Sequence, residues 1–126
     1  MDDHRTAAAV GRTTEAGFVT VRGSGDLDLG CAPRLRQLLL TAVREAARGV
    51  VADLSAVTFC DSTILSVLVD AHRAALACRV PFAITADRAS VVRPLEILGL
   101  DTLLPLYADL DAARAAVSRC PQTRVS

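Results

Sequence analysis

Apolar positions along the chain follow two kinds of spacing, one typical of strands and one typical of helices. Short apolar runs of the kind found in strands are separated by longer stretches in which apolar residues recur at helical spacing. Strands are expected at residues 18–22, 50–54, 81–85 and 103–107, and a weaker alternating run at residues 7–13 indicates an earlier strand. Helices are expected at residues 33–48, 62–78, 88–98 and 110–118.

This alternation of strands and helices favours an α/β fold: one domain with a mixed, largely parallel sheet of four to five strands and about four helices. The domain is expected over residues 16–118, and residues 119–126 are expected to form a flexible tail. Residues 1–15 form either a partly disordered segment or a first strand. Gly23-Ser24-Gly25 predicts a turn, and Gly49 predicts the end of the first helix.

The junction between the run at residues 50–54 and the next helix carries the candidate chemistry. The run is almost wholly apolar, as in a strand covered on both faces, and a short loop is expected after it. Asp61-Ser62-Thr63 then opens the helix, at a carboxyl end of a strand, where α/β folds place their binding sites. A hydroxyl there can cap the helix, act as a nucleophile or accept a phosphate.

Helical spacing divides the residues after Asp61 into two faces. Ile64, Leu68, Ala71 and Ala75 fall on the core face, whereas Ser66, Asp70, Arg73 and Ala77 form a narrow polar stripe. This pattern predicts a helix that lies against the sheet and shows only a thin line to water.

Composition narrows the classes of function. The chain has 126 residues, 52% of them hydrophobic, and a formal net charge of zero. No basic stripe is present, so nucleic acid is not expected as a partner. All 14 basic residues are arginine, which excludes any mechanism that needs a lysine.

Location and metal chemistry follow from what the sequence lacks. The first residues are polar, and no apolar run approaches the ~18–20 residues that span a membrane, so a cytoplasmic protein without membrane association is expected. The four cysteines, at positions 31, 60, 78 and 120, form no C-x-x-C pair. We therefore expect no metal site and no cofactor.

Four ordered motifs resemble one known family, the STAS-domain anti-sigma factor antagonists, over about residues 18–117. Gly25-Asp26-Leu27-Asp28 resembles the family's acidic turn, and the segment from Val51 to Phe59 resembles its central strand and loop. Asp61-Ser62-Thr63 with Leu65 resembles its phosphorylation motif, and Leu98-Gly99-Leu100-Asp101 resembles its late helix-closing turn.

The resemblance implies a function. Such proteins bind an anti-sigma factor that is also a serine kinase, and thereby release a sigma factor for transcription. The kinase phosphorylates the serine after the motif aspartate, here Ser62, and a serine phosphatase resets it; Asp28 corresponds to an acidic residue near that serine. A monomer or weak dimer is expected. The partner surface is expected to include Asp26, Asp28, Asp61, Ser62, Thr63, Ile64, Leu65 and Ser66.

One position departs from the family pattern. Glycine usually follows the Ser-Ser or Ser-Thr pair, and Ile64 stands there instead. Its branched side chain either packs inward on the core face, changes which kinase fits, or blocks phosphorylation of Ser62.

Three other functions compete with the switch. An enzyme is disfavoured because Ser62 lacks the flanking glycines of a nucleophile elbow, and because the two histidines are His4, near the terminus, and His72, a packing residue beside the core face. A phosphate-receiving response-regulator domain would need a lysine. A STAS-type scaffold, or a subunit of a transport complex, would act without phosphorylation.

Overall fold

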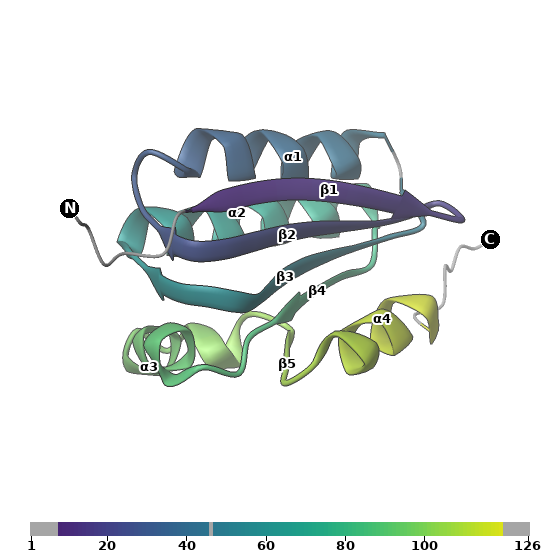
Figure 1. Ribbon diagram of the computed structural model, residues 1–126. Helices are drawn as coiled ribbons and strands as arrows, with labels where there is room; N and C mark the ends of the chain where they lie inside the picture. Colours follow the sequence, from purple (N-terminus) through teal and green to yellow (C-terminus); the bar gives the residue numbers. More distant parts are fainter. Residues whose placement is uncertain (1–7, 46, 120–126) are drawn as a thin grey trace.

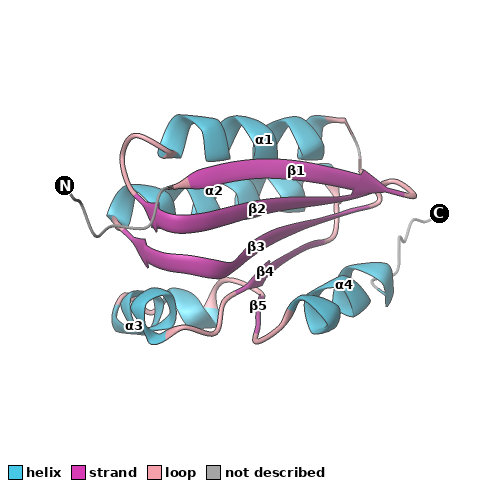
Figure 2. Ribbon diagram, viewed as in Figure 1, coloured by secondary structure: helices cyan, strands magenta, loops and turns pink. Residues whose placement is uncertain are grey.

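The computed structural model describes residues 8–45 and 47–119, and its centre is a five-stranded sheet with the order β1-β2-β3-β4-β5. β1 runs antiparallel to β2, and the other neighbouring strands are parallel, as the mixed, largely parallel prediction requires (Figures 1 and 2). The elements are β1 (Ala9–Glu15), β2 (Phe18–Leu27), α1 (Ala32–Arg44), β3 (Gly49–Cys60), α2 (Ser62–Cys78), β4 (Phe82–Thr85), α3 (Ala89–Ile97), a 3-10 turn (Leu100–Thr102), β5 (Leu106–Tyr107) and α4 (Leu110–Arg119).

Helices cover both faces of the sheet, with α1 and α2 on one face and α3 and α4 on the other (Figure 1). Alternate residues of β3 serve the two layers: Val50 and Ala52 belong to the main core beneath α1 and α2, whereas Val51 packs with Ala113 and Val117 of α4. Burial of β3 on both faces explains why its sequence reads as continuously apolar.

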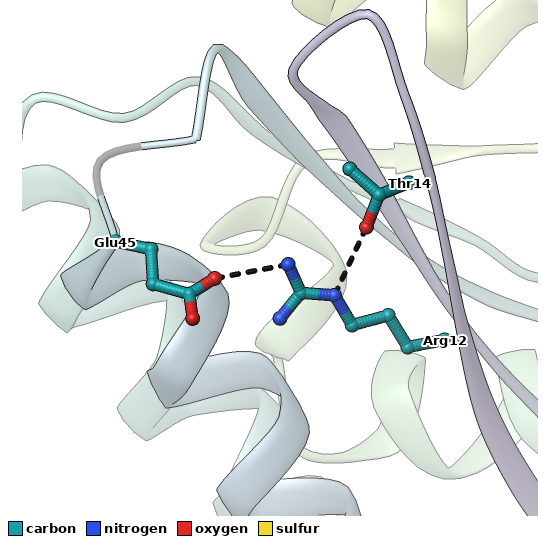
Figure 3. A network of polar contacts seen from close by, with 3 residues as sticks. All are labelled: Arg12, Thr14 and Glu45. Atoms are coloured by element: carbon teal, nitrogen blue, oxygen red, sulfur yellow. Dashed lines mark hydrogen bonds and ion pairs between the residues drawn. The ribbon is translucent and has the colours of Figure 1, made fainter.

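The hairpin of β1 and β2 is tied to the helical layer by side chains. Arg12 of β1 donates to Glu45 at 2.9 Å and to Thr14 at 3.1 Å (Figure 3). Arg48 lies over the ring of Phe18 and donates to the carbonyl oxygen of Ala16 in the hairpin turn. These contacts hold the edge strand β1 against the end of α1.

Two segments that were predicted to be a turn and a loop belong to strands. β2 runs through Gly23-Ser24-Gly25, where a turn was predicted, and β3 continues from the predicted end at residue 54 to Cys60. The cause lies in the register, because β3 contains one extra residue between its pairs with Arg22 and Ser24 and another between its pairs with Gly25 and Asp26. Such bulges disrupt the simple alternation that a strand prediction uses.

Two other boundaries were misplaced. α1 ends at Arg44, and Gly49 opens β3 rather than ending the helix. A side chain at Gly49 would meet the Phe18 ring at 2.9 Å, so this glycine permits close packing. β5 is confined to Leu106–Tyr107, within the predicted range 103–107, and it lies at the sheet edge. Pro105, just before it, accepts a hydrogen bond from the N–H of Ile84 through its carbonyl oxygen.

The long helix α2 confirms the predicted division into faces. Ile64, Leu68, Ala71 and Ala75 are all buried, whereas Ser66 and Arg73 are exposed. The helix closes at Arg79, whose left-handed backbone (φ 59°) returns its N–H to the carbonyl oxygens of Ala75 and Leu76. The bounds Ser62–Cys78 match the expected range.

His72 is a half-buried packing residue, as predicted. Its ring lies 6.0 Å from that of Phe82, and its Nδ1 is buried without a hydrogen-bond partner among the described residues. Burial lowers the pKa of His72 below its ordinary value of 6.5, because the charged imidazolium loses hydration there.

This burial makes stability depend on pH. Below pH 6.5 the unfolded chain binds a proton at His72 more readily than the folded chain does, so the free energy of unfolding should fall as the pH falls, down to the lowered pKa. His72→Leu removes this contribution. Thermal unfolding of both proteins at pH 7.5 and pH 5.5 measures it: the wild type should lose more Tm than His72→Leu, and equal losses would contradict the expectation.

Residues 8–45 and 47–119 include no helix that has both the length and the apolar character needed to cross a membrane. They also include no group of three or more His, Cys, Asp or Glu side chains arranged to hold a metal ion. His4, Cys120 and residues 120–126 of the predicted tail lie outside the described residues, whereas Arg119, the first residue of that tail, is the last residue of α4.

Candidate functional site

The predicted acidic and hydroxyl residues meet at the carboxyl edge of the sheet. Leu27, the last residue of β2, pairs with Cys60, the last residue of β3. Asp28 and Asp61 therefore follow neighbouring strand ends, and Ser62 begins α2 from the same edge. The sequence separation of more than thirty residues is closed by the parallel pairing of β2 and β3.

Asp61 is the residue that caps α2. Its Oδ1 accepts a hydrogen bond from the backbone N–H of Ile64 at 3.2 Å, and its carbonyl oxygen accepts from Ile64 and Leu65. Ser62 follows as the first helical residue, and its side chain is exposed. Within the described residues, its hydroxyl makes no hydrogen bond. Capping is thus done by Asp61, and the Ser62 hydroxyl remains accessible.

Loss of this cap has a definite expected cost. Asp61→Ala should destabilise the fold by about 1 kcal/mol, because the N–H of Ile64 loses its side-chain acceptor. The Tm should then fall by about 3–6 °C. Asp61→Asn is the matched control, since asparagine caps a helix about as well and should restore most of the Tm. Thermal unfolding by circular dichroism measures both, and an unchanged Tm in Asp61→Ala would refute the capping role.

The side chain of Ile64 points into the core. Its side chain is completely buried, within the same core as Leu68 and Leu27. A partner on the surface cannot reach it. The expectation that Ile64 is a contact residue is therefore corrected. Leu65 is also buried, with 4% of its surface exposed, and it reaches the surface only as part of the floor of a hollow.

The two upstream acids take part in local structure. Thr58 of β3 donates its hydroxyl to Asp26 of β2, which ties the two strand ends together. Asp28 accepts from the N–H of Gly30 at 3.0 Å through Oδ1, and its carbonyl oxygen accepts from Cys31 and Ala32. Asp28 thus shapes the loop into α1, and the expected turn is this loop rather than Gly25-Asp26-Leu27, which is strand.

Two hollows flank the first turns of α2. The α3-side hollow, about 400 Å³, is lined by Ser62, Leu65, Ser66, Val69, Asp70, Leu98 and Leu100. The α1-side hollow, about 270 Å³, is lined by Leu29, Ala32, Pro33, Arg36, Thr63, Ser66 and Val67. Ser66 lines both, so the exposed stripe of α2 forms the ridge between them.

Features that the sequence patterns did not reveal complete this surface. Leu29, Phe59 and Leu98 lie near the strand ends or beside the hollows and are exposed by 68%, 50% and 59%. Arg36 of α1 also pairs with Asp70 of α2 at 2.7 Å and joins the two helices across the site. Phe59 was expected in the loop after the strand at residues 50–54; it lies instead in β3, beyond two bulges, with an exposed side chain.

Cys60 is a structural thiol. Burial, with a smaller contribution from the Asp61 carboxylate, raises the pKa of Cys60 from 9.0 to about 11. It therefore stays protonated near neutral pH and is a poor nucleophile or metal ligand. The described histidine, His72, lies on α2 almost three turns beyond Ser62, too far along the helix to act as its base.

Comparisons with known proteins agree with this architecture. The family model of the STAS domain matches residues 10–113. An anti-sigma factor antagonist from Mycobacterium paratuberculosis is 30% identical, with a TM-score of 0.78 over 89% of this chain and 95% of that one. A search of curated protein sequences found no match.

More distant structures share the fold. RsbS from Moorella thermoacetica, in a variant form, is 22% identical, with a TM-score of 0.76 over 90% of this chain and 98% of that one. The Bacillus cell fate determinant SpoIIAA in its phosphorylated form is 16% identical, with a TM-score of 0.65 over 86% of this chain and 98% of that one.

The sheet order, the paired helical layers and the match to residues 10–113 define a STAS domain. The chain belongs to the STAS-domain family of anti-sigma factor antagonists.

Proposed function

We propose that this protein antagonises an anti-sigma factor that is also a serine kinase, and that phosphorylation of Ser62 ends the interaction. The observation that carries the proposal is the division of labour at the start of α2. Asp61 caps α2 by accepting a hydrogen bond from the N–H of Ile64. The hydroxyl of the neighbouring Ser62 is exposed on a surface that also carries accessible apolar groups.

A phosphate on Ser62 is compatible with the fold. The N–H groups in the first turn of a helix have no intrahelical acceptor, and the helix dipole places partial positive charge there. Ser62 and Thr63 supply two such groups, since Asp61 engages only the N–H groups of Ile64 and Leu65. Anions bind readily at helix N-termini, so modification should leave the domain folded.

The same phosphate changes the surface that a partner meets. It adds about −1.5 to −2 charges at neutral pH. Asp61 is adjacent, and Asp28 follows the neighbouring strand end. At roughly 6 Å and an effective dielectric constant of about 20–40, each like-charge pair costs about 1–3 kcal/mol. A partner that buries this surface would have to desolvate the added charge, which favours dissociation.

The chemistry of the surface also indicates the chemistry of the partner. Leu29, Phe59 and Leu98 offer apolar contact, while Asp28 and Asp61 contribute negative charge at the strand ends. A partner that buries this surface under an apolar patch, or that places acidic side chains near Ser62, would bind the unmodified protein and lose affinity once a phosphate is added. We expect contact through Asp26, Asp28, Asp61, Ser62, Thr63 and Ser66, with Leu65 in the hollow floor.

A pull-down from native lysate tests the partner assignment. Tagged wild type and Ser62→Ala should both retain an ATP-binding anti-sigma factor, identified by mass spectrometry, and Ser62→Ala should retain it after ATP is added. Release of the wild type alone by ATP supports the switch. Retention of both proteins in ATP would instead support the scaffold function, and recovery of no anti-sigma factor would overturn the assignment.

A further inference from the structure

A polar hollow lies on the face of the sheet opposite α1 and α2. α4 covers one side of that face, and among the described residues no helix lies over the part formed by β1 and β2 (Figure 1). The hollow has a volume of about 540 Å³, within the range of small-molecule sites. The polar side chains that line it and carry the argument are Thr13, Thr20, Arg22, Ser24, Asp53 and Arg114.

Asp53 gives the hollow a buried acceptor. Only 1% of its surface is exposed, and its Oδ1 accepts from the N–H of Ser55 at 3.0 Å and from the Ser55 hydroxyl at 2.7 Å. Within the described residues Oδ2 accepts no hydrogen bond. Asp53 lines the hollow, which makes Oδ2 the candidate acceptor of the site. A group with an O–H or N–H could satisfy it.

Arginines give the hollow an excess of positive charge. Arg22 is the β2 residue paired with Asp53, and Arg114 approaches from α4; both are exposed. Neither makes an ion pair within 4.0 Å to a carboxylate of residues 8–45 or 47–119, where the ion pairs are Arg12–Glu45 and Arg36–Asp70. Arg12 also lines the hollow, but its guanidinium is engaged by Glu45 (Figure 3). The hollow is therefore lined by two arginines outside these ion pairs and by one aspartate.

We propose that this hollow binds a small hydroxylated phosphate ester, that is, a sugar phosphate. The phosphate would accept charge-assisted hydrogen bonds from Arg22 and Arg114, and a sugar hydroxyl would donate to Asp53 Oδ2. Thr20 and Ser24 offer further hydroxyl partners. Nucleotides are disfavoured, because the lining includes no aromatic side chain on which a base could stack.

Isothermal titration calorimetry with D-glucose 6-phosphate tests the proposal. Arg22→Gln and Arg114→Gln should each weaken binding by about 10- to 100-fold, as expected for loss of a hydrogen bond to a charged group. Arg73→Gln, which alters an exposed arginine on α2, is the matched control and should bind as the wild type does. Circular dichroism verifies that each variant is folded.

Two further titrations separate the parts of the ligand. Inorganic phosphate should bind at least tenfold more weakly than glucose 6-phosphate, since it lacks the hydroxyls that reach Asp53, and glucose should not bind measurably. The proposal is overturned if glucose 6-phosphate does not bind, if both arginine variants bind it normally, or if phosphate binds as tightly. None of these outcomes affects the role of Ser62, which lies at the carboxyl edge.

Discussion

Ser62→Asp should weaken binding to the anti-sigma factor by about 10- to 100-fold, while the free energy of unfolding changes by less than about 0.5 kcal/mol. The affinity falls because a carboxylate at this position places negative charge beside Asp61 on the contact surface. The fold survives because Ser62 is exposed and the cap belongs to Asp61. Surface plasmon resonance and thermal unfolding of the same preparations measure the two effects.

The controls for Ser62→Asp are chosen to match its chemistry. Ser90→Asp introduces the same charge at an exposed serine in the first turn of another helix, α3, and should leave affinity unchanged. Ser62→Ala removes the hydroxyl without adding charge and should bind about as tightly as the wild type. A large loss of stability in Ser62→Asp would show instead that Ser62 has a mainly structural role.

Ile64→Ala should destabilise the domain by about 2–5 kcal/mol, the largest loss expected from a substitution near the site. The side chain is fully buried between α2 and the sheet, so its removal leaves a cavity in the main core. Urea unfolding measures this loss as a lower midpoint concentration with little change in slope.

Two variants calibrate the effect of Ile64. Ile64→Val should cost only about 0.5–1.5 kcal/mol, and Ser66→Ala, at an exposed position of the same helix, should stay within about 0.5 kcal/mol of the wild type. If Ile64→Ala were as stable as the wild type but no longer bound the partner, Ile64 would be a contact residue. That result would contradict the role in core packing that its burial indicates. The side chain that replaces the family's glycine thus lies in the core.

Regular periodicity made much of the fold predictable. The spacing of Ile64, Leu68, Ala71 and Ala75 predicted the buried face of α2, and the bounds of the helix also match. The predicted ends of elements were wrong where local geometry interrupts the regular spacing of apolar residues. β3 runs through two bulges to Cys60, although the apolar run at residues 50–54 predicted that the strand ends at residue 54.

The site was predictable in part for a similar reason. A motif can place Asp61 and Ser62 at a strand-to-helix junction, because adjacent residues share local structure. It cannot say which of the two caps the helix, since aspartate and serine are both good caps. Contacts between distant segments, such as Arg36 with Asp70 and the hollows beside Ser66, depend on how α1 packs against α2.

The most direct test of the switch is to incubate the protein with ATP and the anti-sigma factor kinase recovered by pull-down, and then map phosphate by tandem mass spectrometry. A single phosphate is expected on Ser62, together with loss of the complex, and none on Ser62→Ala. An unmodified Ser62 in a protein that stays bound to the active kinase would contradict the account.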